Sequence, residues 1–296
     1  MSKKPLTRDE QFLAKAAGDD VPMPKPLTRV QEFLERIVER LSGSVTGETL
    51  SNAIEPLNAS IAQLSRETIQ FRHGKGTFTA TATGTNVVWQ YGGQQVQNNK
   101  CTFDVKSDNG LICMDFDSIT SLFIQSNAKN KMDLSDLGGK ITNTLNLYNC
   151  TNITGDLSDL GGKITSLLSL YNCTNITGDL SDLGGEITNT LSLYNCTNIT
   201  GDLSDLGGEI ASMLNLSNCS NITGVYSGTK YPKTFIVSKA AITSADMDAN
   251  LINFAASGVK SGKFTAVGMK RTAASDDAVA TLVANGWTVS GLTKEG

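Results

Sequence analysis

The chain has 296 residues, of which 39% are apolar and 18% are charged, and its formal net charge is −4. This composition is typical of a globular protein with a sizeable core, and mild acidity without a cluster of basic residues argues against nucleic-acid binding. No apolar run approaches the roughly 20 residues that cross a bilayer, so we expect no membrane span.

Residues 1–42 contain a sequence that occurs twice. The string Lys-Pro-Leu-Thr-Arg, with Phe-Leu shortly after it, begins at Lys4 and again at Lys25. Each copy also carries a capping-box pattern, which predicts a short helix. Two such helices are too small to build a core. They form either a flexible extension or a docking arm that becomes ordered on a partner, and the duplication favours the arm. The expected attachment residues are Pro5, Leu6, Arg8, Phe12, Pro26, Leu27, Arg29 and Phe33.

Tandem openings of this kind resemble the N-termini of bacteriophage virion appendage proteins, the head and tail fibres. The resemblance implies that residues 1–42 attach the chain to other virion proteins.

Residues 43–75 show an apolar spacing of alternating threes and fours, which runs through Leu50, Leu57, Leu64 and Phe71. This spacing predicts a helical stem that begins near Pro56. The stem is either one amphipathic helix that packs on its own chain or a parallel bundle of two or three chains, which would make the protein a homo-oligomer.

Residues 76–118 are expected to form a small β cap. Threonines alternate with Phe78 and small residues from Thr77 onward, and a second alternation begins at Cys101. A turn sequence then precedes Ile112 and the final alternating run. Such a domain would cover the first hydrophobic edge of the segment that follows it.

Residues 119–226 contain a 23-residue repeat, and its cysteines Cys150, Cys173, Cys196 and Cys219 mark the period. A fixed period of this length predicts a solenoid, in which each unit buries its apolar side against its neighbours. Leu168 and Leu170 alternate as in a short strand with both side chains inward. We expect the cysteines to be buried free thiols and not zinc ligands, because zinc sites use closely spaced ligand pairs.

The apolar spacing of Leu168, Leu170, Cys173, Ile176 and Gly178 resembles the leucine-rich repeat. One unit earlier the chain has the asparagine form of this motif, and the tail of each unit is similar to the plant-type variant, in which a second short extended segment follows the glycine. The resemblance implies an α/β solenoid over residues 119–226.

Residues 227–296 predict a C-terminal cap of strands and helices. One helix has Ser244 as its N-cap and Gly258 past its end, and a second helix stops at Gly286. Strands are expected around Phe235 and from Phe264. The predicted fold is therefore an α/β solenoid of the leucine-rich repeat kind, with a small β N-terminal cap, a β-α C-terminal cap and a helical N-terminal arm and stem.

Catalytic signatures are absent from the sequence. His73 is the single histidine and stands beside Gly74, so we expect it in a solvated loop. There is no phosphate-binding loop, dinucleotide fingerprint or paired-cysteine motif. We therefore expect no enzyme activity, cofactor or metal centre.

Two rows of aspartates also recur with the period, one from Asp133 and one from Asp136. Stacked about 5 Å apart, like charges repel by roughly 1 kcal/mol per pair even in water. We expect the carboxylates to cap backbone N–H groups of their own turns. The alternative is Ca²⁺ bound between turns.

The outward positions of the repeated strand carry no charge and include a tyrosine in three units. Tyrosines flanked by amides suit a polar ligand such as a glycan, or a protein partner. The alternative is stacking with no ligand. The predicted binding surface is Tyr148, Asn149, Tyr171, Asn172, Tyr194 and Asn195.

These features favour a non-enzymatic bacteriophage virion structural protein, of fibre or decoration type, that displays a leucine-rich repeat surface to a host protein or glycan. The first residues hold no apolar segment, so we expect no signal peptide and assembly in the bacterial cytoplasm. The alternatives are a bacterial leucine-rich repeat adhesion or interaction protein at the cell surface, and an intracellular scaffold.

Overall fold

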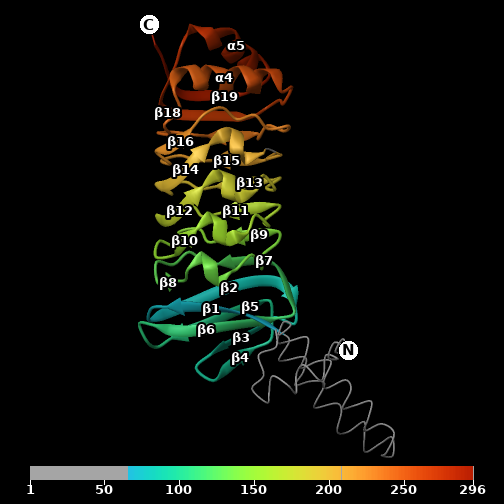
Figure 1. Ribbon diagram of the computed structural model, residues 1–296, viewed down its shortest axis with the longest axis vertical. Coiled ribbons are helices and arrows are strands. Elements are labelled where there is room, and N and C mark those ends of the chain that lie inside the picture. The colour runs from blue at the N-terminus through green and yellow to red at the C-terminus, as the bar shows by residue number, and fades with distance from the viewer. Residues whose placement is uncertain (1–65, 208, 296) are drawn as a thin grey trace, which may run out of the picture. The chain divides into compact units, whose positions relative to one another are not determined.

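The computed structural model describes residues 66–207 and 209–295 (Figure 1). The chain divides into two units, Met1–Arg66 and Glu67–Gly296, and the fold given below is that of the second. The predicted arm (1–42), the predicted stem up to residue 65 and the eight attachment residues lie outside the described part.

The predicted fold class, an α/β solenoid with a helical arm, is wrong. The described residues are mostly β-structure in three sheets, the largest a mixed sheet of ten strands. They contain only two short α-helices, α4 (Ser244–Ala256) and α5 (Asp276–Ala284). Neither is long and apolar enough to cross a membrane, and this holds for every helix in the described residues.

A five-stranded sheet, in the order β4-β3-β6-β1-β8, opens the described part. The strand β1 of this sheet corrects the predicted stem, because it consists of residues that were expected at the end of the helix. It pairs antiparallel with β6, from Glu67 opposite Phe116 to His73 opposite Gly110. Phe71 thereby enters a core with Phe78 and Trp89. The strands are β1 (Glu67–His73), β3 (Val88–Tyr91), β4 (Gln94–Val96), β6 (Gly110–Phe116) and β8 (Asn130–Lys131).

The ten-stranded sheet runs through the rest of the described chain (Figure 1). Its repeated strands are parallel with a shift of one full unit, so that Leu145, Leu168, Leu191 and Leu214 lie side by side. β7 joins this parallel array on one side and pairs antiparallel with β2 on the other. Two strands of the predicted β cap, β2 and β5, therefore share one sheet with the repeats, while its other strands belong to the five-stranded sheet. The strands are β2 (Gly76–Thr85), β5 (Lys100–Val105), β7 (Ser118–Ile124), β9 (Thr144–Asn146), β11 (Leu167–Ser169), β13 (Thr190–Ser192), β15 (Met213–Asn215), β17 (Thr234–Ile236), β18 (Lys263–Arg271) and β19 (Thr288–Lys294).

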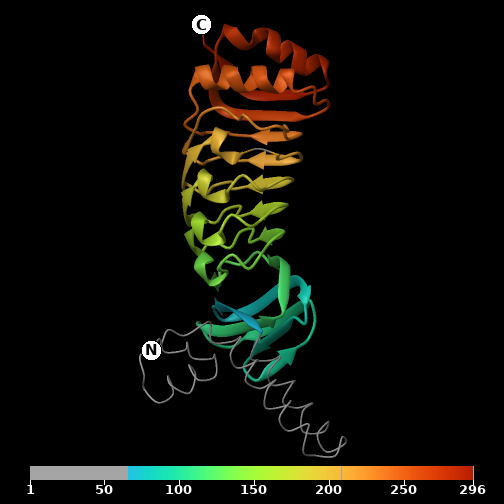
Figure 2. The same cartoon turned by 45° about the vertical axis from the view of Figure 1, so that its right-hand side comes forward.

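The second half of each unit forms a strand and a 3-10 turn in place of an α-helix. The aspartate that caps the turn and the left-handed glycine that ends it leave room for only four residues, as between Asp179 and Gly184 (φ 65°). The turns contact one another from unit to unit, and Figure 2 shows them as a column. The elements are β10 (Thr154–Asp156), β12 (Asn175–Asp179), β14 (Asn198–Asp202), β16 (Asn221–Thr223), η1 (Leu134–Asp136), η2 (Leu157–Leu160), η3 (Leu180–Leu183) and η4 (Leu203–Leu206).

The repeated apolar positions fill the space between the two sheets, as predicted. Leu168, Leu170 and Ile176 are fully buried. Cys173 is buried with them as a free thiol, and its Sγ donates to the Leu147 carbonyl at 3.1 Å. Burial raises the pKa of this thiol to about 12. The inward, structural role predicted for the cysteines is confirmed.

The C-terminal part follows the predicted order of strands and helices, with one correction. The N-cap of α4 is Thr243 and not Ser244, because the Thr243 side chain accepts from the Asp246 N–H. Phe254 of α4 packs against Phe235 and Trp287, so the helix covers the last strands. A 3-10 turn, η5 (Ala273–Ser275), leads into α5.

Candidate functional site

The tyrosines of the predicted binding surface form one stack along the ten-stranded sheet. The ring centroids of Tyr148 and Tyr171 are 4.5 Å apart, and those of Tyr171 and Tyr194 are 4.3 Å apart, with interplanar angles of 24° and 10°. The spacing follows from the sheet, because neighbouring strands lie about 4.8 Å apart. Tyr148 ends the stack and is 41% exposed, while the other two rings are half-buried. Burial raises the pKa of Tyr171, and the electrostatic effect of the neighbouring Tyr194 and Tyr148 hydroxyls adds to this shift.

The asparagines beside the tyrosines have a conformational role that the sequence analysis did not assign. Asn149, Asn172 and Asn195 adopt φ values of 58°, 62° and 61°. Asparagine enters this left-handed region more easily than most residues, because its short polar side chain bonds locally. The conformation directs each backbone N–H to the next unit, as in the 2.7 Å bond from Asn172 to the Tyr194 carbonyl.

The asparagine side chains bind one another. Asn172 donates to Asn149 Oδ1 at 2.9 Å, and Asn195 donates to Asn172 Oδ1 at 2.7 Å. The six predicted surface residues are therefore adjacent. The tyrosine rings are their more accessible part, because the asparagine side-chain amides use hydrogen-bonding groups on one another. Ser169 and Ser192, which also occupy outward positions of the repeated strand, are buried.

The tyrosine row continues beyond Tyr148 onto small polar residues. The register that pairs β7 with β9 places Gln125 one unit before Tyr148, and the Gln125 N–H donates to the Thr79 carbonyl of β2 at 2.9 Å. Thr79 in turn lies opposite Thr102 of β5. A hollow of about 220 Å³ opens in this region. Its lining residues are Thr77, Thr79, Gln125, Ser126, Asn127 and Asn130.

Sequence reasoning missed this hollow, although the period contained a signal for it. Gln125 and Ser126 stand one full unit before Tyr148 and Asn149. Extending the outward positions one unit toward the N-terminus would have identified both. The contribution of Thr77 and Thr79 depends on the pairing of β2 with β7, which the period does not encode.

His73 corrects the prediction of a solvated loop residue. It ends β1, is 0% exposed and packs edge-on against Phe78. Its Nε2 lies 3.0 Å from the Asn127 amide nitrogen. Burial lowers the pKa of His73; the backbone of Gly74 opposes this shift, and the charge of Lys129 adds to it.

The aspartate rows cap the turns, as predicted. In each unit the first carboxylate accepts from the backbone of the turn and the second bonds back to the N-cap N–H, as Asp156 and Asp159 do in η2. Hydrogen bonds from the Ser158 backbone and hydroxyl lower the pKa of Asp156. Within residues 66–207 and 209–295, no group of three or more histidine, cysteine or acidic side chains is arranged to hold a metal ion.

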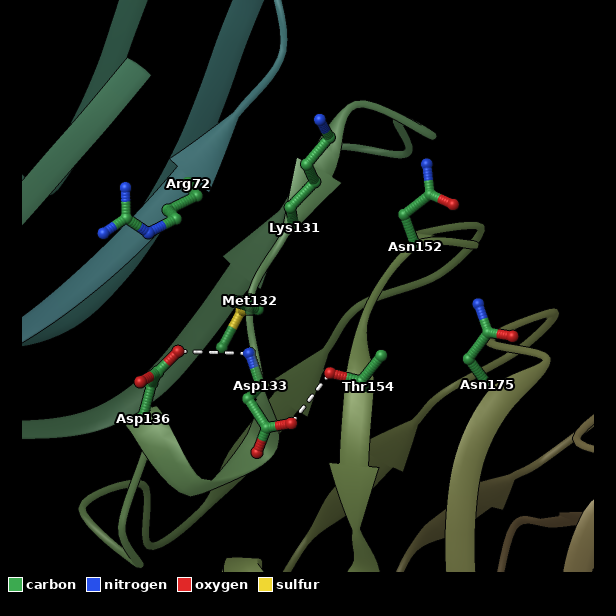
Figure 3. Close-up of a pocket in the computed structure, with 8 residues that line it drawn as sticks. All are labelled: Arg72, Lys131, Met132, Asp133, Asp136, Asn152, Thr154 and Asn175. Atoms are coloured by element: carbon green, nitrogen blue, oxygen red, sulfur yellow. Dashed lines mark hydrogen bonds between the residues drawn. The ribbon is translucent and has the colours of Figure 1, made fainter. Parts of the chain in front are cut away.

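A second hollow, of about 630 Å³, lies where β1 and β8 meet the first unit (Figure 3). Asp133 accepts from the Ser135 N–H at 3.0 Å, and Asp136 accepts from the Asp133 N–H at 3.1 Å, so both carboxylates cap the η1 turn. Asp133 also accepts from the Thr154 hydroxyl at 2.7 Å. Arg72 and Lys131 are register partners in the antiparallel pair of β1 and β8. The lining therefore contains both positive and negative side chains, and its two carboxylates already cap the η1 turn. The residues around it are Arg72, Lys131, Met132, Asp133, Asp136, Asn152, Thr154 and Asn175.

Comparison of the chain with protein-family models, with curated proteins and with solved structures finds no match.

Proposed function

We propose that this chain is a non-enzymatic display protein that binds a polar ligand, a glycan or a host surface protein, through the tyrosine stack. The observation that supports this proposal is the stack of Tyr148, Tyr171 and Tyr194 on the ten-stranded sheet. Tyrosine buries a large area at little cost in rotamer entropy, and its hydroxyl remains available to a polar partner.

The flanking residues suit weak, repeated contacts. The residues beside the stack are asparagine and serine, so no ion pair contributes at this surface. Binding there should be weak at each copy, should depend on many copies and should respond little to salt.

We further propose that the chain is a structural protein of a bacteriophage virion, of fibre or decoration type, held by residues 1–42. The duplicated string that begins at Lys4 and Lys25 supports this proposal through its resemblance to virion appendage proteins. The resemblance of the repeats to leucine-rich repeats supports a binding role, since such arrays present extended surfaces. Other virion proteins would be the partners of the arm.

The test replaces Tyr148, Tyr171 and Tyr194 with serine. Folding is checked by circular dichroism, and adsorption is measured on host cells and on a glycan array. We expect adsorption to fall at least tenfold, while the matched exposed variant Ile252→Ser on α4 retains it. Unchanged adsorption of the triple variant would mean that the tyrosine rings only pack against one another.

Mass spectrometry of purified particles tests the virion assignment, and absence of the chain from particles would favour a bacterial adhesion protein.

A further inference from the structure

We propose that the hollow beyond Tyr148 is a subsite for one ring of a neutral saccharide. This inference rests on the proposed function and names the ligand class for one end of the tyrosine stack. Its basis is the abrupt change along one row of the sheet, from three stacked rings to Gln125 and Thr79.

Tyr148 lies next to this hollow, because the register places it one strand away from the lining residue Gln125. One face of its ring stacks on Tyr171, and Gln125 follows on the side away from Tyr171. Its 41% exposure agrees with a ring that is covered on one face only. The C–H face of a saccharide ring is apolar and slightly positive, and it therefore complements the negative face of an aromatic ring.

Phe123 extends the apolar surface beside the hollow. It lies in β7 two residues before Gln125, which directly follows the strand, and is 43% exposed. Side chains at this spacing share one face of a strand. Tyr148 and Phe123 therefore place aromatic groups of two neighbouring rows beside the hollow, outside its lining.

The hollow also has hydrogen-bonding groups to offer. The Gln125 amide and the Ser126 hydroxyl are exposed, and within the described residues neither side chain makes a hydrogen bond. The Thr79 hydroxyl shares a long 3.3 Å contact with Thr102. By contrast, Asn127 is engaged with His73 and with the Thr77 carbonyl. The available groups are thus an amide and hydroxyls, which suit the alternating donors and acceptors of a sugar.

Size and charge restrict the ligand further. The volume of about 220 Å³ is below the roughly 300–1,000 Å³ of sites that enclose a drug-sized ligand, which suits one ring of a longer chain. Among the described residues, none that lines the hollow is charged, so a carboxylate would lose hydration without gaining an ion pair from the lining. A neutral hexose or N-acetylhexosamine should therefore bind better than a uronic acid.

The experiment uses saturation-transfer NMR on the full chain, with methyl glycosides of neutral hexoses and N-acetylhexosamines as probes and a methyl glucuronide for comparison. Gln125→Ala and Thr79→Val each remove polar groups from the hollow. Thr190→Val makes the same change as Thr79→Val on the same sheet, away from the hollow. We expect at least a tenfold loss of probe signal in the first two variants and none in the third.

The outcomes separate this subsite from the proposed function. If neutral probes bind the unaltered chain and both hollow variants alike, the subsite is wrong, and the serine triple variant still decides the role of the stack. A glucuronide signal equal to that of the neutral probes would overturn the assignment of ligand class. If no glycoside binds at all, the subsite is overturned, while particle adsorption separately tests the proposed function.

Discussion

His73 shows how a single residue can be placed by pairing that is distant in sequence. Its glycine neighbours suggest a loop, but β1 pairs with β6 and β8 and carries the ring into the core against Phe78. Sequence reasoning considered the local neighbours only, whereas the burial arises from strands that lie far along the chain. By contrast, the inward cysteines were predicted correctly, because their environment repeats with the period.

We predict that His73 makes the stability of the protein depend on pH near neutrality. Burial lowers its folded pKa below the value of about 6.5 in an unfolded chain. The folded state therefore binds the proton less tightly, so stability is complete above about pH 6.5 and declines as the pH falls below it, by at most about 1.4 kcal/mol for each pH unit. Urea denaturation at pH 7.5 and pH 5.5 measures the difference.

The control for this prediction is His73→Phe, which keeps an aromatic ring beside Phe78 and removes the titrating group. His73 is the single histidine of the chain. The aspartates, whose pKa values are lowered by hydrogen bonds, should affect stability only below about pH 4. An equal loss of stability in the variant between pH 7.5 and pH 5.5 would contradict the assignment.

At the scale of elements, the periodic strands were predictable and the turn structure was predictable only in part. Alternation of Leu168 and Leu170 identified the inner strand, and the aspartates identified the capped turn. The expected helical content was wrong, because the capping aspartate and the left-handed glycine enclose too few residues for an α-helix. The apolar spacing assigned to a helical stem likewise continued into β1, where Phe71 alternates with exposed residues.

The row of left-handed asparagines leads to a prediction at this scale. Asn172→Ala should lower stability by about 1–2 kcal/mol, because alanine is strained at φ 62° and loses the amide ladder. Asn172→Gly loses the same ladder but tolerates the backbone angle, so it should cost less. Chemical denaturation of both variants provides the measurement. If the glycine variant proves less stable than the alanine variant, the backbone angle is not what asparagine supplies.

At the scale of the whole molecule, the order of units was predictable and the joining of domains was not. The 23-residue period fixed which residues would be equivalent. It gave no information on β2, which pairs with β7 and joins part of the N-terminal cap to the same sheet. For the same reason the hollow beyond Tyr148, which needs both β2 and β7, was not foreseen.

We predict that one complete unit can be deleted without loss of the fold. Removal of residues 164–186 joins Lys163 to Ile187, which is equivalent to Ile164, and each unit contacts mainly its neighbours. The shortened chain should unfold cooperatively, with a denaturant dependence lower by roughly a tenth because less surface is exposed. Removal of residues 164–183, which breaks the period, is the matched control and should yield an unfolded or aggregated chain. Equal behaviour of the two deletions would contradict the prediction.

The hydrogen bonds between units have a consequence for how such a chain can change over generations. Each unit bonds to the next through equivalent atoms, from Asn149 to Tyr171 and then from Asn172 to Tyr194, so no internal position specifies how many units there are. Only the two ends of the sheet are unique. The gene can therefore gain or lose whole segments that encode 23 residues. The length of the sheet and the number of stacked tyrosines would then change together, while the sequences at both ends of the sheet stay the same.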